Sequence, residues 1–288
     1  MLAIILALVS AIGYGSSDFA AGLASRTASV IQVTLLTTVA SAVVVAAALP
    51  FAASRPASGA ALAWGAVAGA GGTLGAFALY LGFRYAAFSV AGPLSAVGTA
   101  GFSVLAGLLL GERPSTLALI GIVLALPAIV GVSASAAGEE VPQEGARGRP
   151  AAGVAAGLVA GACFALLLIG LNRAGPGGGL WPVAAAAVAE LAVAVTAAAV
   201  TRNLRLPGWR PGRFAVMAGV TGAAGTILYF FASHDGFLAV TAVLTSLYPA
   251  STIVLARILL GERLTRLRLA GLTLAAVCVA LIAAGGAG

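Results

Sequence analysis

Two carboxylic acids lie inside long apolar stretches of the chain. Glu190 is ten residues into an apolar run from about 180 to 200, which in a helix places it about 15 Å deep. If the run crosses a bilayer, a charge at its centre costs about 2.5–3.5 kcal/mol even on the insertion scale. A carboxylate there can hold the ammonium group of a solute, or bind and release a proton. The alternative is a protonated acid hydrogen-bonded within the packing, because burial favours the neutral form.

Asp18 is a second acid in an apolar run, and it has polar neighbours. It lies about 24 Å along the first run, nearer to its end than to its centre. Tyr14 and Ser17 share its helical face at i−4 and i−1, so the face can form hydrogen bonds with a polar solute. Arg26 follows two turns later on the same face. An ion pair with Arg26, or a hydrogen bond at the helix end, is therefore the alternative role for Asp18.

A second polar group occurs late in the chain, where Tyr229, Ser246 and Tyr248 are accompanied by Pro249. Proline lacks an N–H group and bends a helix. Pro249 in the middle of one apolar run, and Pro93 near the start of another, would help to shape a cavity. A kink that serves only packing explains both prolines equally well.

His234 is the third candidate for proton binding, beside Glu190 and Asp18. Histidine titrates close to neutral pH, the range that a proton-coupled carrier would use. It precedes Asp235 at the end of an apolar run. The alternative is that His234 and Asp235 are simply the polar end of a helix.

The sequence contains no arrangement of residues typical of catalysis or metal binding. Its two cysteines, Cys163 and Cys278, lie inside apolar runs and its histidine is single, so neither a disulfide framework nor a zinc site is expected. No nucleophile–base arrangement or nucleotide-binding loop is present. We therefore expect no cofactor, no metal and no enzymatic activity. Its fifteen arginines are scattered between apolar runs, so no nucleic-acid partner is expected.

The composition predicts a multi-pass membrane protein. Of the 288 residues, 61% are hydrophobic and 8% are charged, whereas a soluble domain has about 45–50% and about 25%. The mean hydropathy is +1.11. So few charged residues could not cover a core of this size with a polar, water-exposed surface. The composition therefore argues against a water-soluble enzyme and against a disordered chain.

Ten apolar runs reach the length of about 20 helical residues that a bilayer requires. We expect all-α spans at about 2–22, 29–50, 59–81, 88–110, 115–134, 151–171, 180–200, 212–232, 238–260 and 267–285. One polar stretch, 133–150, holds three of the eight acids and two prolines, which is typical of a flexible linker. We therefore divide the chain into a first five-helix repeat at 1–134, a polar linker at 135–150 and a second five-helix repeat at 151–288.

The two halves share an internal repeat. Val104–Arg113 aligns with Val254–Arg263 at an offset of 150, with eight of ten positions identical. After five crossings the chain begins its second half from the opposite face of the membrane, so two similar halves must be inverted relative to each other. Inverted repeats around a shared central site are a recurring architecture of secondary transporters.

The repeated Leu-Gly-Glu-Arg segment has a structural explanation. Gly111 and Gly261 suit the left-handed position that closes a helix. Glu112 and Glu262 each precede another span, whose N-terminal end favours a carboxylate. We therefore expect these four residues, like Pro93 and Pro249, to serve the architecture.

The sequence resembles the ten-span EamA-type members of the drug/metabolite transporter superfamily over essentially its whole length. The resemblance lies in Tyr14-Gly-Ser-Ser-Asp18, Val90-Ala-Gly-Pro-Leu94, Ser246-Leu-Tyr-Pro249 and the two Leu-Gly-Glu-Arg helix ends. It implies a plasma-membrane carrier, often an exporter of amino acids or other small metabolites, with a central cavity built from both halves. Where the family often has Trp-Gly in the first span, this chain has Tyr14-Gly15.

We therefore predict a secondary transporter that exports a small polar or amphipathic, amino-acid-like metabolite by alternating access. Glu190 and Asp18 would anchor the solute, and the site would be completed by Tyr14, Ser17, Tyr229, Ser246 and Tyr248. The alternative is broad-specificity efflux of drugs or cations by exchange with protons. The expected partners are a small-molecule solute, the lipid bilayer and, for the alternative, protons. A membrane-embedded enzyme or sensor is disfavoured, because one acid alone lies at mid-span and no soluble output domain is present.

The arginines also predict an orientation. With ten spans, the odd-numbered loops carry eleven arginines and the even-numbered loops carry three. Basic residues favour the cytoplasmic side, so this count places both termini outside the cytoplasm. The resemblance implies cytoplasmic termini, and the two predictions remain as alternatives.

Overall fold

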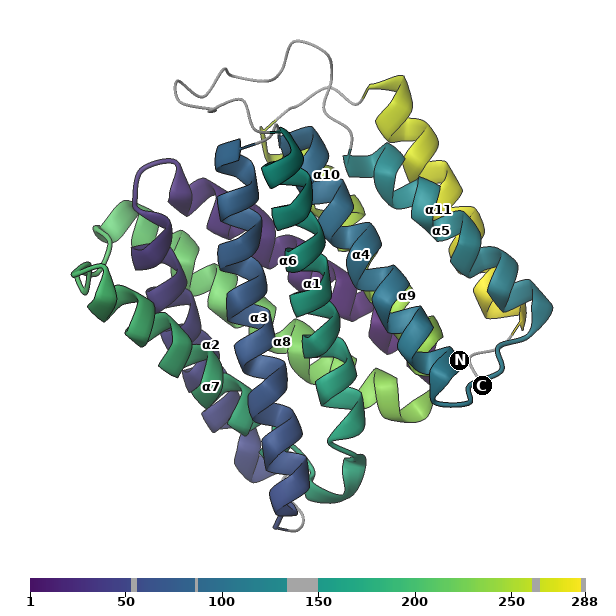
Figure 1. Cartoon of the computed structure of the whole chain (residues 1–288), viewed down its shortest axis with the longest axis horizontal. Helices are drawn as coiled ribbons and strands as arrows, with labels where there is room; N and C mark the ends of the chain where they lie inside the picture. Colours follow the sequence, from purple (N-terminus) through teal and green to yellow (C-terminus); the bar gives the residue numbers. More distant parts are fainter. Residues whose placement is uncertain (53–55, 86–87, 134–149, 261–264, 286–288) are drawn as a thin grey trace.

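The structure is a bundle of helices formed by both halves of the chain (Figure 1). The computed structural model describes residues 1–52, 56–85, 88–133, 150–260 and 265–285. The first half forms α1 (Leu2–Ser25), α2 (Val30–Ala52), α3 (Gly59–Tyr85), α4 (Phe88–Leu109) and α5 (Thr116–Ser133). The second half forms α6 (Pro150–Arg173), a short 3-10 turn η1 (Pro176–Gly178), α7 (Trp181–Val200), α8 (Trp209–Asp235), α9 (Leu238–Thr245), α10 (Tyr248–Leu260) and α11 (Arg266–Gly285).

The predicted all-α fold with ten spans is confirmed, and the observed bounds differ from the expected ones by a few residues. In the described part of the chain, eight apolar stretches of at least 18 residues could cross a membrane by length and composition, one of them 238–260. Two shorter apolar stretches, 94–109 and 116–131, lie in α4 and α5. The ninth span is formed by α9 and α10 together.

The two five-helix repeats are inverted. α1 begins at the end of the bundle where both termini lie, whereas its counterpart α6 begins at the opposite end (Figure 1). The other pairs related by the repeat are α2 and α7, α3 and α8, α4 and the α9–α10 span, and α5 and α11. Their packing follows the same relation. In the first pair of equivalent contacts, α1 packs on α8 and α6 packs on α3. In the second, α2 packs on α8 and α7 packs on α3.

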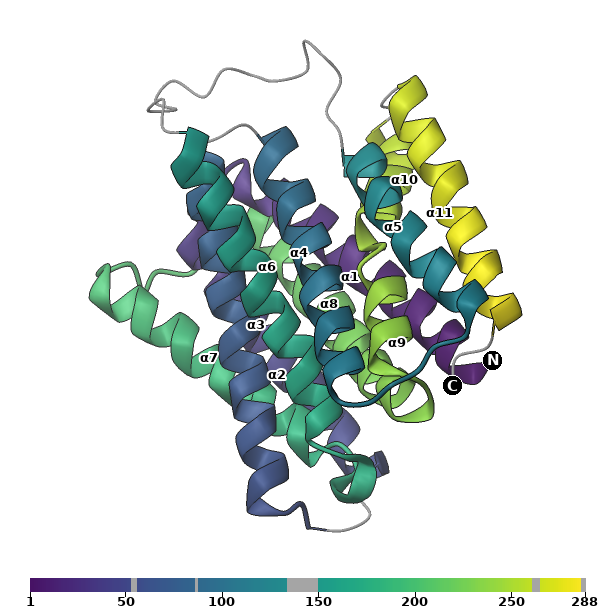
Figure 2. The same cartoon turned by 45° about the vertical axis from the view of Figure 1, so that its right-hand side comes forward.

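The packed units are two lobes that each contain helices of both repeats. α1, α2, α8, α9 and α10 form the α1 lobe, and α3, α4, α6 and α7 form the α6 lobe. The two lobes meet mainly where α2 packs on α7 and where α4 packs on α9. α5 and α11 pack on each other at one edge of the molecule (Figure 2). A half of the sequence is therefore not a separate packed unit.

Glycines let the backbones of the two repeats touch inside each lobe. A Cβ atom on Gly69 of α3 would overlap the carbonyl oxygen of Ala186 on α7. At the position 150 residues later, a Cβ atom on Gly219 of α8 would overlap the carbonyl oxygen of Thr37 on α2. Such close contact is the usual way in which helices associate in a bilayer, where the hydrophobic effect does not drive them together.

We expect Gly69→Ala and Gly219→Ala each to destabilise the protein by about 1–3 kcal/mol, because the added methyl group forces two backbones apart. Gly101→Ala is the matched control, since nothing lies within 4 Å of a Cβ atom at that position, and alanine is the better helix former there. Thermal unfolding of the purified proteins in detergent measures the difference. Equal midpoints for all three variants would contradict the packing described here.

The end of α4 is closed by Gly111. Its φ of 91° is in the left-handed region that favours glycine. The Gly111 N–H donates to the Leu108 carbonyl at 3.0 Å, and the Glu112 N–H donates to the Gly107 carbonyl at 3.0 Å. This is the hydrogen-bond pattern of a Schellman motif. Its counterparts Gly261 and Glu262 lie outside the described residues.

The Glu112 carboxylate caps a helix of the other repeat, α9, and not α5, the span that follows it in sequence. Oε1 accepts a hydrogen bond from the Leu238 N–H at 2.5 Å, and Oε2 accepts one from the Ala239 N–H at 2.8 Å. These N–H groups belong to the first turn of α9, which has no intrahelical acceptor for them. Every residue of α9 is buried. Glu112 therefore links the α6 lobe to the α1 lobe at the end of the bundle that carries the termini.

We expect Glu112→Ala to lower the stability of the folded protein by about 1–2 kcal/mol, the usual cost of removing a helix cap. Glu112→Gln should lower the stability by less, because the amide oxygen of glutamine still accepts one hydrogen bond. Thermal unfolding midpoints in detergent measure both effects. If Glu112→Ala unfolds at the wild-type temperature, the carboxylate does not stabilise α9.

The ninth span is broken just before Pro249. α9 ends at Thr245 and α10 begins at Tyr248, so Pro249 occupies the first turn of α10, where its missing N–H is not needed. The intervening N–H groups bond to nearby carbonyls, as in Leu247 to Leu244 at 3.2 Å. Pro93 lies inside α4. The break lets the backbone change direction in the middle of the bundle.

Candidate functional site

A cavity of about 210 Å³ lies between the two lobes. The α1 lobe contributes residues of α1, α2, α8 and the α9–α10 break, and the α6 lobe contributes residues of α3, α4, α6 and α7. Hydroxyl groups form most of its polar lining, from Tyr14, Ser17, Thr34, Thr37, Thr38, Ser41, Thr73, Thr99, Thr226, Thr245, Ser246 and Tyr248. Among the described residues that line the cavity, the carboxyl groups are those of Asp18 and Glu190, and none is Lys, Arg or His.

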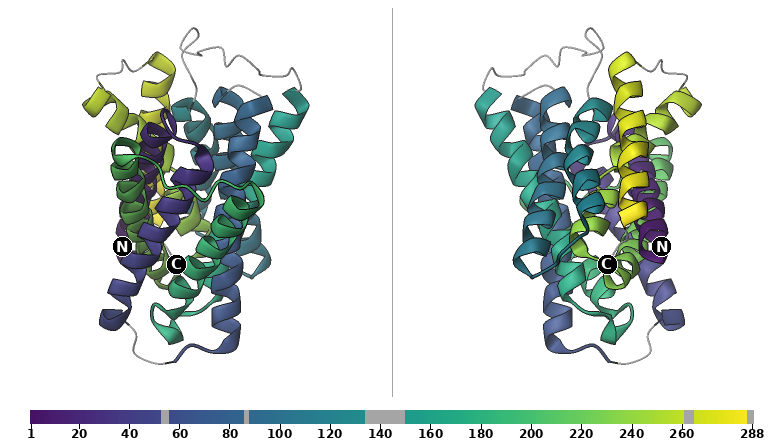
Figure 3. Two further views of the ribbon diagram at one scale, coloured as in Figure 1. Left: turned by 90° about the vertical axis from the view of Figure 1, so that its left-hand side faces the viewer. Right: turned by 90° about the vertical axis from the view of Figure 1, so that its right-hand side faces the viewer.

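The cavity occupies the middle of the bundle and the part away from the termini. α1 begins at the terminal end, and its lining residues lie between 14 and 21; α2 runs back, and its lining residues lie between 33 and 41. The terminal end of α1 instead packs in a core that includes the buried residues Ala3, Ile4 and Ala7. Figure 3 shows the bundle from two sides, with both termini in its lower half.

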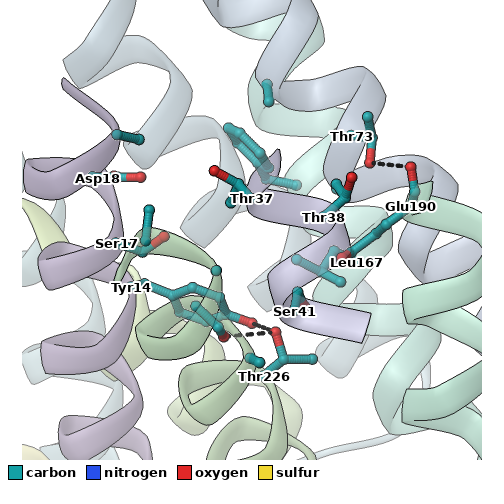
Figure 4. A pocket seen from close by; sticks show the side chains of 18 of the residues that line it. Tyr14, Ser17, Asp18, Thr37, Thr38, Ser41, Thr73, Leu167, Glu190 and Thr226 are labelled. Carbon is teal, nitrogen blue, oxygen red and sulfur yellow. Dashed lines mark hydrogen bonds between the residues drawn. The ribbon is translucent and has the colours of Figure 1, made fainter. Parts of the chain in front are cut away.

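The predicted group on α1 lies in the cavity wall, as Figure 4 shows for Tyr14, Ser17 and Asp18. The hydroxyl groups of Tyr14 and Thr226 lie 3.0 Å apart, in hydrogen-bond contact. The Tyr14 ring packs against the backbone of Gly225, where a Cβ atom would lie 3.3 Å from Cγ of the ring. The Asp18 side chain is exposed, and the ion pair with Arg26 that we considered is not formed.

Glu190 lies on α7 beside Gly72 of α3. A Cβ atom on Gly72 would lie 3.5 Å from Oε1 of Glu190, so this glycine leaves room around the carboxyl group. The backbone carbonyl of Glu190 accepts a hydrogen bond from the Thr73 hydroxyl at 3.4 Å. Within the described ranges no basic side chain pairs with the carboxyl group, so it is available to a solute or a proton.

The two acids break the symmetry of the repeats. The residue 150 positions after Asp18 is Leu168, and the residue 150 positions before Glu190 is Ala40. The counterpart of Tyr14 is Phe164, which packs against Gly75 much as Tyr14 packs against Gly225. The scaffold is therefore symmetric, whereas its polar chemistry is not.

Ser246 and Tyr248 reach the cavity from the break between α9 and α10. The Ser246 side chain is 1% exposed, and its hydroxyl group has no hydrogen-bond partner. Buried hydroxyl groups are nearly always hydrogen-bonded. An unpartnered one in a cavity wall is therefore suited to bind a polar group of a solute.

Tyr229 and His234, also predicted for the site, do not line this cavity. Tyr229 is fully buried, and its hydroxyl group donates to the Leu168 carbonyl at 3.2 Å. The ring nitrogens of His234 lie 2.6 Å from the Phe230 carbonyl oxygen and 3.1 Å from that of Asn172. Tyr229 and His234 thus connect α8 to α6, between the lobes and on the side of the termini.

Threonines and serines on α2 form a polar wall that the sequence analysis missed. Thr34, Thr37, Thr38 and Ser41 line the cavity, and their spacing of i, i+3, i+4 and i+7 is the signature of one helix face. The signal was therefore present in the sequence. Hydroxyl residues are tolerated in apolar helices, because they can bond to the backbone of their own helix. Their presence in an apolar run therefore did not by itself indicate a cavity wall.

Comparison with known proteins identifies the family. The model of the EamA-like transporter family matches residues 1–134 and, separately, residues 151–284. The chain belongs to the EamA-like transporter family. This EamA-like protein is therefore a multi-pass membrane transporter of the drug/metabolite type, built from two copies of the family's repeat. No curated protein matches it in sequence.

A solved structure shows the same fold. One protein, described only as "Crystal structure of protein", superposes with a TM-score of 0.72 at 19% identity, over 98% of this chain and 94% of that chain. At this identity the match bears on the fold alone. The roles of individual cavity residues in this EamA-like protein must therefore be argued from its own geometry.

We expect a cysteine in place of Ser17 to react with a water-soluble thiol reagent, because that side chain lines the cavity. Ala232→Cys is the matched control and should stay unlabelled, because Ala232 is 0% exposed. Both are made after Cys163 and Cys278 are replaced by alanine. Labelling is measured by mass spectrometry, and equal labelling at the two positions would contradict a water-accessible cavity.

Proposed function

We propose that this EamA-like protein is a secondary transporter that exports a small polar or amphipathic solute across the plasma membrane. The solute has an amino group and is of amino-acid-like size. The observation that carries the proposal is the cavity between the lobes, with its two carboxyl groups, its hydroxyl groups and no basic residue among the described lining. Carboxylates and hydroxyl oxygens accept hydrogen bonds from an ammonium group.

The size of the cavity favours a small metabolite. Its volume of about 210 Å³ is below the range of about 300–1,000 Å³ typical of pockets for drug-sized ligands. A broad-specificity drug carrier needs more space or a more apolar wall. The two acids nevertheless suit the exchange of protons against a solute, so proton-coupled efflux is the second candidate.

Alternating access follows from the arrangement of the lobes. On the side of the termini, the lobes are joined by the Glu112 cap on α9 and by Asn172, whose amide donates to the Ser233 carbonyl at 2.7 Å. The cavity extends toward the other side. Release of the solute on the side of the termini requires these contacts to break, and the inverted repeat provides an equivalent closed arrangement at the opposite end.

Solute profiling tests the proposal. Cells that produce the wild-type protein should accumulate a specific amino compound outside, and cells that produce Glu190→Ala should not, because the carboxylate that holds the ammonium group is lost. Asp235→Asn is the control, since Asp235 is exposed at the end of α8 and away from the cavity. If wild type and Glu190→Ala release the same compounds in equal amounts, the proposal is wrong.

Transport by purified protein in liposomes separates the two candidates. For a proton exchanger, Glu190→Gln should abolish accumulation of the solute against its gradient and the response to an imposed pH gradient. For a carrier that is not coupled to protons, wild-type flux should be unaffected by the pH gradient. Direct measurement of internal pH with a trapped dye distinguishes these outcomes.

A further inference from the structure

The two carboxyl groups of the cavity belong to different lobes. Asp18 lies on α1 in the α1 lobe, and Glu190 lies on α7 in the α6 lobe. Figure 4 shows them on opposite sides of the cavity, with Thr37 and Thr38 of α2 between them. A solute in the cavity therefore has a carboxyl group on each side.

Charge balance restricts which solutes suit such a cavity. One ammonium group can pair with one carboxylate, which leaves the other acid without a cationic partner among the described residues that line the cavity. A charge inside a membrane-spanning bundle is costly when it has no partner. A zwitterion is less suitable still, because its own carboxylate adds a third negative charge. Two ammonium groups on one solute compensate both acids.

The rest of the lining fits a molecule with polar ends. Ser17 and Tyr248 flank the cavity on the side of α1, and Thr73 lies beside Glu190. The buried Ser246 hydroxyl group, which has no partner of its own, is an independent sign that a hydrogen-bonding ligand belongs here. Leu79 and Leu167 contribute apolar surface that suits a hydrocarbon chain.

We propose that the cavity binds solutes with two separated cationic groups, of the straight-chain α,ω-diamine class. One ammonium group pairs with Asp18 and the other with Glu190. This inference rests on the proposed function and narrows its solute from compounds with one amino group to compounds with two. A diamine then joins the lobes through its own length, which a monoamine cannot do.

Binding to the purified full-length protein in detergent tests the inference. Isothermal titration calorimetry is performed with α,ω-diamines of increasing chain length and with the alkylamines of the same carbon number. The affinity of the diamines should be highest at one intermediate length, the length that spans the cavity. At that length the diamine should bind at least about tenfold more tightly than the matched monoamine, because it gains a second charged hydrogen bond.

Two conservative variants locate the ammonium groups. Asp18→Asn and Glu190→Gln should each remove the advantage of the diamine over the monoamine, because each leaves one carboxylate. Asp235→Asn, outside the cavity, should retain it. Retained binding of the monoamine shows that a variant is folded, and circular dichroism provides a second check.

The outcomes separate this inference from the proposed function. If diamine and monoamine bind equally well, or if affinity rises steadily with carbon number in both series, the diamine inference is wrong and the carrier of amino compounds stands. A diamine advantage that survives either cavity variant also overturns it. If no amine binds the folded wild type and solute profiling finds no exported amino compound, the proposed function fails too.

Discussion

Direct contact between the helix backbones of the two repeats is the constraint on which this structure depends. Helices in a bilayer gain little from the hydrophobic effect on association, so they need close packing and hydrogen bonds. Gly69 and Gly219 allow that contact at equivalent places in the two lobes. Hydroxyl groups add hydrogen bonds between the repeats. The Ser10 hydroxyl of α1, for example, donates to the Gly225 carbonyl of α8 at 2.8 Å. Because these contacts join one repeat to the other, each lobe is a mixed unit, and the cavity forms between lobes.

The hydrogen bonds between the lobes have a different character. Those of Glu112, Tyr229 and His234 lie on the side of the termini and involve a few side chains on backbone groups. They can be broken and reformed without disturbing the glycine contacts inside a lobe. The glycine contacts thus lie inside the lobes, whereas these hydrogen bonds lie between them, an arrangement that suits a carrier with two alternative openings. Asp18 and Glu190, the side chains that we propose bind the solute, take no part in these hydrogen bonds between the lobes.

Much of the fold could be predicted from the sequence, because span length and the Leu-Gly-Glu-Arg repeat depend on local residues. The lobes could not, since an apolar helix in a bilayer carries no polar face to show which neighbour it packs on. Tyr229 was predicted to line the cavity because it is a polar side chain in an apolar span. In the structure its hydroxyl group is bonded instead to the Leu168 carbonyl. Glu112 was correctly associated with a helix N-terminus, but its partner α9 lies 126 residues away. The acids Asp18 and Glu190 were identifiable because a carboxylate in an apolar span has few structural explanations.

Distances between the lobes test the central claim, that two mixed lobes rock around one shared cavity. Spin labels at Leu2 and Leu109, both exposed near the termini, report on that side. Labels at Thr27 and Ala151, both exposed, report on the opposite side. The two distances are measured by pulsed electron paramagnetic resonance with and without a saturating amine solute. The solute should shorten the distance between Thr27 and Ala151. In the population that opens toward the termini, the distance between Leu2 and Leu109 should lengthen. If both distances keep the same distribution in every condition, the lobes do not move against each other and the account is wrong.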